Sequence, residues 1–270
     1  MPRRQDRPRG LFPALLKFWR GRRGLSQLDL ALNAEVSARH ISFLETGRAK
    51  PSEEMVLRLG QALRIPLRQQ NEMLVAASLE PVFPEPDPQR ELPPAINHVL
   101  ERMMAQHEPY PLAVMNQRYD VLCTNQACGR LLTRFIADPS FLSDPINVCK
   151  LLFDPRGARP FVESWAHTAV HLLARLHRDA LAEPHDGGLA DLVEELTAYP
   201  DVPEAWATPD FSLPCDPVFP IVLARDGERF AFLTTLTVFS APLNVTLEEL
   251  RIESYYPMDE ATEQALSRLV

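Results

Sequence analysis

The sequence has no hydrophobic run near the roughly 20 consecutive apolar residues that a membrane-spanning helix needs. Its basic start, MPRRQDRPRG, leads into an amphipathic stretch and lacks the form of a secretory signal. The four cysteines show no CxxC spacing, so we expect reduced and mostly buried thiols. Together these absences predict a cytosolic protein that has no contact with a membrane.

The sequence also lacks the motifs of common enzymes. It contains no GxSxG elbow, no Walker loop and no GxGxxG, and we find no nucleophile–base pair. His167 and His171 stand four residues apart on an expected helix, a spacing that can chelate zinc or nickel. A third ligand is missing at an obvious spacing, although His177 or Cys149 could fold nearby. We therefore predict neither a catalytic residue nor a metal site.

Charge is distributed unevenly along the chain. The formal net charge is −8, yet residues 1–80 carry 14 basic and 8 acidic residues. The rest of the chain carries 14 basic and 28 acidic residues. A basic module joined to an acidic one is compatible with a nucleic-acid-binding head on a body that does not touch phosphate.

The first 78 residues show the periodicity of five short helices. Ser26 and Ser37 stand where N-caps belong, and Gly47 stands where a helix ends. We predict an all-α five-helix domain over residues 11–78, preceded by a basic tail over residues 1–10.

The stretch from Ser26 to Gly47, SQLDLALNAEVSARHISFLETG, resembles the helix-turn-helix of the Cro/C1 (XRE) repressor family. Ala31 provides the small residue needed where the second helix crosses the third. Arg20 and Glu45 match an arginine and a glutamate that pair in this family. The family's turn usually holds glycine because it needs a positive φ, and Glu35 stands there at a cost of about 1 kcal/mol.

The resemblance implies that the third helix enters the major groove of DNA with its N-terminus first. Arg39 is then expected to contact guanine O6 and N7, Phe43 a thymine methyl group and Gln27 a phosphate. The expected DNA-contacting residues are Gln27, Ser37, Ala38, Arg39, His40, Ser42, Phe43, Thr46, Arg48 and Lys50. The implied partner is a palindromic double-stranded operator, which a homodimer reads in half-sites roughly one helical turn apart.

Residues 79–94 form an expected proline-rich linker, because six prolines fall within residues 81–94. Beyond the linker, the patterns predict a mixed α+β domain over residues 95–270. Strands are expected at Leu112–Met115, Tyr119–Thr124, Pro217–Ala224, Arg229–Phe239 and Leu250–Tyr256. Helices are expected at Ala95–Gln106, Asn125–Ile136, Asn147–Phe153, Phe161–Leu181 and Leu189–Tyr199, with a last one capped by Asp259.

This element order is that of a PAS-like sensor. Residues 111–132, 167–180 and 232–257 also resemble the ligand-binding domain of MmyB-like regulators. The resemblance implies a five-stranded sheet backed by helices, with an apolar pocket between them that can hold a fatty-acid-like molecule. It implies no other cofactor, and it suggests the bacterial cytoplasm.

Aromatic and aliphatic stripes at these spacings are usually core, but a ligand pocket needs apolar walls and a few polar groups that orient the ligand. His167, His171, Arg175 and Tyr255 are the candidates for the polar contacts. The full expected ligand-binding set is Trp165, His167, His171, Arg175, Phe232, Leu236, Val238 and Tyr255.

We therefore predict a multi-domain, non-enzymatic regulator: a Cro/C1-type head that binds DNA, and a PAS-like body that binds a small effector. Three alternatives remain for the body. It is a protein-interaction module without a ligand, an enzyme carried on a DNA-binding head, or a metal sensor. Cys123 and Cys128, five residues apart, also leave redox sensing open beside simple burial.

Overall fold

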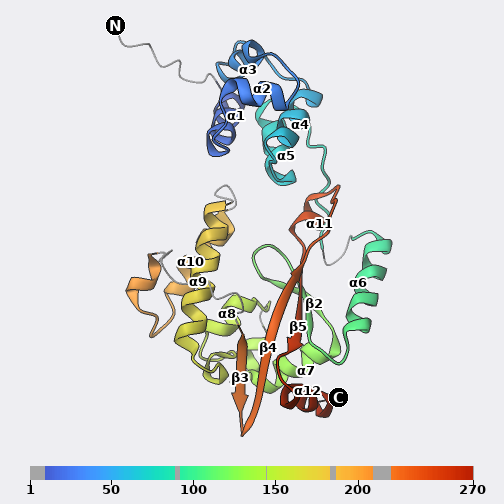
Figure 1. Ribbon diagram of the computed structural model, residues 1–270, viewed down its shortest axis with the longest axis vertical. Helices are drawn as coiled ribbons and strands as arrows, with labels where there is room; N and C mark the ends of the chain where they lie inside the picture. The colour runs from blue at the N-terminus through green and yellow to red at the C-terminus, as the bar shows by residue number, and fades with distance from the viewer. Residues whose placement is uncertain (1–9, 89–91, 144, 183–186, 209–219, 270) are drawn as a thin grey trace. The chain divides into compact units, whose positions relative to one another are not determined.

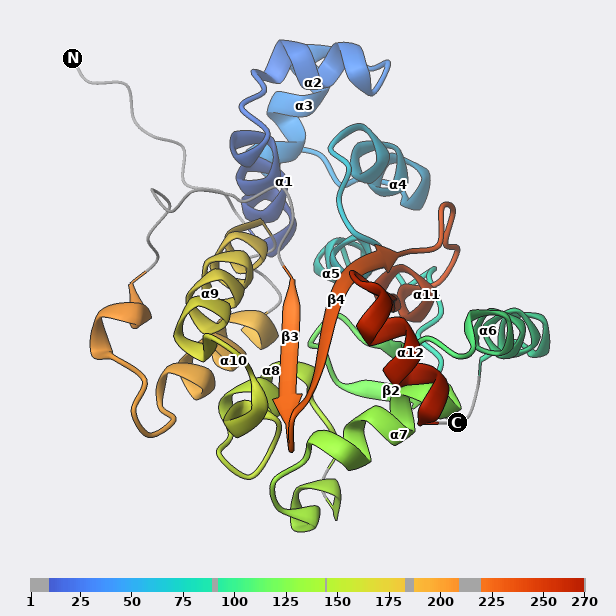
Figure 2. The same ribbon diagram turned by 60° about the horizontal axis from the view of Figure 1, so that its bottom comes forward.

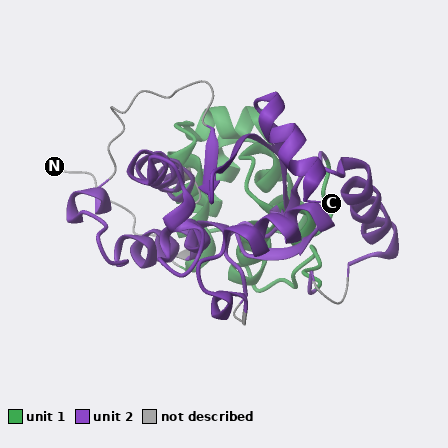
Figure 3. Ribbon diagram, turned by 90° about the horizontal axis from the view of Figure 1, so that it is seen from below, with its two compact units in different colours: residues 1–86, 241–248 green, residues 87–240, 249–270 purple. Residues whose placement is uncertain are grey.

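The computed structural model describes residues 10–88, 92–143, 145–182, 187–208 and 220–269. Tertiary contacts divide the chain into two compact units (Figure 1; Figure 3). Unit 1 comprises residues 1–86 and 241–248, and unit 2 comprises residues 87–240 and 249–270. Three expected features lie outside the described residues: all but the last residue of the N-terminal tail, the first residues of the strand expected from Pro217, and Cys215.

Unit 1 contains the five-helix bundle that the periodicity predicts. Its helices are α1 (Leu11–Arg22), α2 (Gln27–Asn33), α3 (Ala38–Glu45), α4 (Glu53–Ala62) and α5 (Leu67–Ala76). Ser26 and Ser37 cap α2 and α3 as expected, each accepting a backbone N–H three residues on. The bundle closes over a core in which Trp19 and Ile41 are almost completely buried. Ala31 is buried as well, so α2 can approach α3 closely.

The turn between α2 and α3 is left-handed, as the family pattern requires. Glu35 has a φ of 53°, in the region where a Cβ crowds the following carbonyl. The backbone conformation at Glu35 is therefore strained, and glycine would adopt it without that strain.

Unit 1 also contains a segment from far along the chain, which the periodicity did not predict. This segment, residues 241–248, holds most of the short helix α11 (Val245–Glu249). Val245 is completely buried, and its N–H donates to the carbonyl of Pro84 at 2.9 Å. Figure 3 shows the segment in the colour of unit 1.

The first half of the proline-rich linker is fixed to α5 by one side chain. The Asn71 amide oxygen accepts the N–H groups of Val82 and Phe83, each at 3.1 Å. Its amide nitrogen donates to the carbonyl of Phe83 at 2.8 Å. Because prolines cannot donate a backbone hydrogen bond, this side chain supplies the ordering that a regular element would have given.

Unit 2 is built on a five-stranded antiparallel sheet with the order β2-β1-β5-β4-β3. The strands are β1 (Leu112–Met115), β2 (Val121–Thr124), β3 (Ile221–Arg225), β4 (Glu228–Thr237) and β5 (Arg251–Pro257). Asp226 and Gly227, both with positive φ, form the tight β3–β4 turn expected from the sequence. The five strands confirm the α+β class.

The sheet is accompanied by helices. The α-helices are α6 (Pro94–His107), α7 (Gln126–Phe135), α8 (Val148–Phe153), α9 (Trp165–Ala182), α10 (Gly187–Thr197) and α12 (Glu260–Arg268). The short 3-10 turns are η1 (Pro139–Ser143), η2 (Arg159–Phe161) and η3 (Glu204–Ala207). Figure 2 shows α8, α9 and α10 grouped together beside β3, and α12 lying along β4. The core between helices and sheet includes Phe135, Phe153, Phe230 and Phe232.

Two expected boundaries were wrong for a backbone reason. The long helix begins at Trp165 and not at Phe161, because Ser164 has a φ of 52° and separates it from η2. The second strand begins at Val121 and not at Tyr119, which has a φ of 67°. Positive φ at a residue other than glycine is hard to read from sequence. Among the described residues, no helix combines the length and the apolar character needed to cross a membrane.

We predict that Glu35→Gly raises the free energy of unfolding of unit 1 by about 1 kcal/mol, because glycine adopts the left-handed conformation without strain. Urea unfolding of the full chain, followed by circular dichroism, measures this change. Glu35→Ala is the control, since alanine keeps the strain and loses only an exposed side chain. Equal stabilities of the two variants would contradict the prediction.

Candidate functional sites

A buried carboxylate joins three helix ends in unit 1. Glu45, at the end of α3, is only 5% exposed. Arg20 from α1 donates to its two oxygens at 2.5 and 3.1 Å, and Gln27 from α2 donates to Oε2 at 2.7 Å. The Arg20–Glu45 pair expected from the family pattern is thus present, and it holds Gln27 in place.

The N-terminus of α2 is already occupied by the chain itself. Ser26 and Asp29 form a reciprocal capping box, with bonds of 3.1 Å to the Ser26 hydroxyl and 2.9 Å to the Asp29 carboxylate. Hydrogen bonds from Ser26 lower the pKa of Asp29, which favours its charged form. Glu45 already accepts one amide hydrogen of Gln27, so a DNA phosphate near this helix end would accept the second one. The negative charge of Asp29 would lie close to that phosphate.

The outward face of α3 presents an arginine stacked on an aromatic ring. The guanidinium of the exposed Arg39 lies 5.2 Å from the ring centre of the half-buried Phe43, one turn later. His40 and Ser42 are half-buried, and Ala38 packs partly against the bundle core. The structure thus brings together the expected base-reading residues on one helix.

The expected phosphate contacts beyond α3 lie on the surface that follows it. Arg48 and Lys50 are exposed. The hydroxyl of Thr46 donates to the carbonyl of Ser42 at 2.8 Å, so this side chain would contact a phosphate only by breaking that bond. Ser37 is exposed, and its hydroxyl oxygen accepts the N–H of His40 at 3.1 Å.

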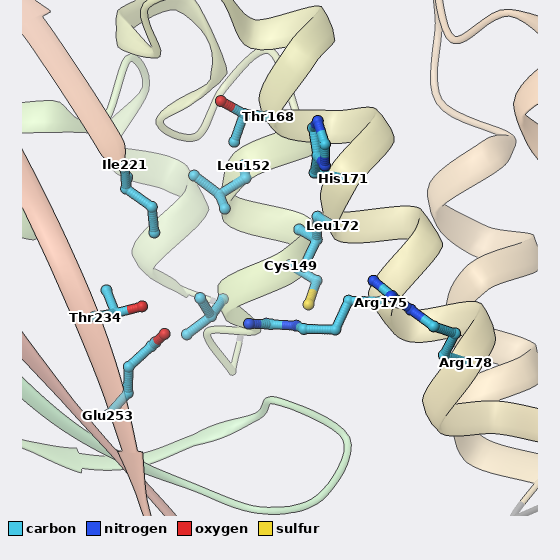
Figure 4. Close-up of a pocket in the computed structure, with 11 residues that line it drawn as sticks. Cys149, Leu152, Thr168, His171, Leu172, Arg175, Arg178, Ile221, Thr234 and Glu253 are labelled. Atoms are coloured by element: carbon cyan, nitrogen blue, oxygen red, sulfur yellow. The ribbon is translucent and has the colours of Figure 1, made fainter. Parts of the chain in front are cut away.

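Unit 2 contains a cavity of about 160 Å³ between α8, α9 and the sheet (Figure 4). Its walls are mostly apolar, with a few polar side chains. The lining residues are Val148, Cys149, Leu152, Thr168, His171, Leu172, Arg175, Arg178, Ile221, Thr234 and Glu253.

The polar side chains of the cavity come from two opposite walls. Figure 4 shows Arg175 extending from α9 toward the strands that carry Thr234 and Glu253. Its guanidinium lies 5.3 Å from the ring centre of Tyr119, and the ion pairs found among the described residues do not include it. A cation in such a cavity can bind an anionic group.

Glu253 is the acidic group of the cavity. It is 6% exposed, and its Oε2 accepts the hydroxyl of Tyr255 at 2.8 Å. Burial raises the pKa of Glu253, while the Tyr255 hydrogen bond, the charge of Arg175 and a hydrogen bond from Thr234 act in the opposite direction.

The expected ligand-binding residues fall into three groups. His171 and Arg175 line the cavity. Trp165 packs in the core, where its indole N–H donates to the carbonyl of Leu152 at 2.7 Å. Phe232 and Tyr255 pack edge to face with ring centres 5.8 Å apart, so they support the wall that Glu253 belongs to and do not line the cavity.

The remaining three expected residues lie outside the cavity. Leu236 and Val238, at the end of β4 and just beyond it, are 53% and 51% exposed, and His167 is exposed on α9. The rings of His167 and His171 have centres 4.3 Å apart. No group of three or more metal-binding side chains occurs within the part of the chain that the structure describes.

Sequence patterns did not indicate most of the lining residues. Arg178 and Thr168 could have been found, because they follow the helical spacing of His171 and Arg175 along α9. Thr234 and Glu253 gave no signal of their own, since β4 and β5 do not alternate cleanly between buried and exposed residues.

The described cysteines are free thiols in or near the core. Burial raises the pKa of Cys128 to about 12 and also raises the pKa of Cys149 and Cys123. A thiol with a raised pKa is a poor nucleophile. The structure therefore favours the burial interpretation over redox sensing for these three residues.

Residues 96–269 match the family described as MmyB-like transcription regulator ligand binding domain, which is more than half of the 270-residue chain. The chain belongs to the MmyB-like transcription regulators. Residues 16–70 of this regulator match the helix-turn-helix family. The two matches show a DNA-binding transcription regulator with a ligand-binding domain.

Among solved structures, this MmyB-like regulator is similar to an RNA-binding light-oxygen-voltage receptor, at 12% identity and a TM-score of 0.29. The match covers 97% of this chain but spans only 64% of the receptor chain. A TM-score this low does not establish a common fold. No curated protein matches the chain in sequence.

Proposed function

We propose that this MmyB-like regulator binds a palindromic operator as a homodimer in the bacterial cytoplasm, and that a small fatty-acid-like effector in unit 2 modulates this binding. The observation that carries the proposal is the apolar cavity into which Arg175 extends. The ligand-binding family and the basic charge of residues 1–80 support it.

The operator contacts follow from α3. A helix of eight residues reads only a few base pairs, so two copies on a symmetric site provide the specificity that one copy lacks. Arg39 supplies two donors for guanine, and Phe43 supplies an apolar surface for a thymine methyl group. Their stacking holds the guanidinium on this face before DNA arrives.

The cavity has apolar and polar walls, and each would contact a different part of the effector. Val148, Leu152 and Ile221 offer apolar surface for a short acyl chain. Arg175 and His171 lie on α9 where a carboxylate of the same molecule can bind. The volume, about 160 Å³, is small among ligand pockets and favours a short acid.

We predict that Arg39→Ala and Gln27→Ala weaken DNA binding in different ways. Loss of Arg39 removes about 1–3 kcal/mol of discrimination at one base pair, whereas loss of Gln27 weakens all sequences alike. Fluorescence anisotropy with an operator selected from a random pool, and with scrambled DNA, measures both over a salt series. Equal losses of both variants on both DNAs would show that the docking of α3 is wrong.

We predict that the purified regulator carries or binds a small acid and that Arg175→Ala loses it. Native mass spectrometry of the full chain, before and after addition of hexanoate, measures occupancy. Arg118→Ala is the control, because Arg118 is exposed and does not line the cavity. A clean apo mass with no hexanoate adduct would favour a protein-interaction module in place of a sensor.

A further inference from the structure

Glu253 has no role in the proposed binding of a simple fatty acid. Its carboxyl group lines the cavity opposite Arg175 and is almost fully buried. A carboxyl group has about four acceptor positions, of which hydrogen bonds from Tyr255, at 2.8 Å, and from Thr234 occupy two. A saturated acyl chain lying against Glu253 would displace water without replacing its hydrogen bonds, which is unfavourable.

We propose that the effector is a hydroxy acid, whose carboxylate binds Arg175 and whose hydroxyl group binds Glu253. This inference rests on the proposed effector site and specifies its ligand. Thr234 lies beside Glu253 on the same wall of the cavity, and its hydroxyl group is a second polar group there. The site therefore selects against acids that lack a polar group along the chain.

A hydroxyl group fits this site better than an ammonium group. Burial raises the pKa of Glu253, so its neutral form persists to a higher pH than that of an exposed carboxyl group. A neutral carboxyl group can both donate to and accept from a hydroxyl, whereas an ammonium group needs the charged carboxylate to offset its own burial.

Isothermal titration calorimetry of the full chain with hexanoate and with β-hydroxyhexanoate tests the proposal. We expect the hydroxy acid to bind the wild type about tenfold more tightly, the value of one hydrogen bond to a buried group. In Glu253→Leu the two affinities become equal, and in Glu253→Gln, which keeps an acceptor, the preference remains. Glu194→Leu on α10, exposed and away from the cavity, keeps the wild-type preference.

The outcomes separate this inference from the proposed function. Equal affinities in the wild type, both weakened by Arg175→Ala, would overturn the hydroxy acid and leave the acid effector standing. Affinities for both acids that Arg175→Ala does not change would overturn both. The wild-type comparison decides even where Glu253→Leu does not fold.

A second inference comes from the segment 241–248, which joins β4 to β5 and yet belongs to unit 1. Within unit 1, the hydroxyl of Thr246 donates to the carbonyl of Pro86 at 2.6 Å. The Glu248 carboxylate accepts the N–H of Leu67, in the first turn of α5, at 2.6 Å. The segment is thus bonded both to the linker and to the helical bundle.

The two strands that lead into and out of this segment both contribute to the cavity. Thr234 lies on β4 and Glu253 on β5, and the two strands pair from Phe232 with Pro257 to Thr237 with Ile252. A ligand bound between these side chains and α9 therefore contacts β4 a few residues before the segment and β5 a few residues after it. We infer that segment 241–248 transmits effector binding to the DNA-binding unit.

The double variant Thr246→Val, Glu248→Ala tests this inference in the full chain. Operator affinity is measured by anisotropy with and without β-hydroxyhexanoate and with hexanoate. In the wild type we expect the better-binding acid to change operator affinity about fivefold or more. In the double variant we expect the acid to leave operator affinity unchanged. Its affinity for the effector, and its affinity for the operator without effector, should stay within about twofold of the wild-type values.

The control is Thr235→Val, an exposed residue of β4 outside the segment, which should keep the wild-type response. An effector response that persists in the double variant would overturn the role of the segment, as would a wild type that binds an acid without any response. Calorimetry establishes acid binding separately, so neither result depends on which acid is preferred.

Discussion

A polar group that leaves water must find partners within the protein, and this constraint applies to one buried glutamate in each unit. In unit 1, Arg20 and Gln27 surround the carboxylate of Glu45, so the ends of α1, α2 and α3 meet at one point. In unit 2, Glu253 is buried on the cavity wall with Tyr255 as its partner. The first carboxylate is enclosed by the protein and fixes a DNA-binding helix. The second faces a cavity.

The boundary between the units does not follow the order of the chain. The proline-rich linker follows α5, and both Asn71 and the segment 241–248 form hydrogen bonds to the linker. The DNA-binding unit is therefore completed by residues that lie between two strands of the ligand-binding sheet. This arrangement gives the sheet a covalent connection to the DNA-binding unit in addition to the linker.

Local patterns predicted those features that depend on neighbouring residues. The five helices of unit 1 and the caps at Ser26 and Ser37 each follow from a few adjacent side chains. The left-handed turn at Glu35 was expected only from the family resemblance. His171 and Arg175 were found for the same reason, since one helix carries both. Leu236 and Val238 were selected on the same grounds as Phe232, but β4 extends past β3, and its last residues remain exposed.

The sequence by itself determined the helices of the DNA-binding unit and the α+β class of the second unit, because helical and strand periodicities and capping residues act over short distances. The families of both parts came from the resemblance of longer motifs. The tertiary structure alone decided which side chains line the cavity and that segment 241–248 completes the DNA-binding unit. These features depend on contacts between residues far apart in the chain, such as Leu67 with Glu248, which no local pattern encodes.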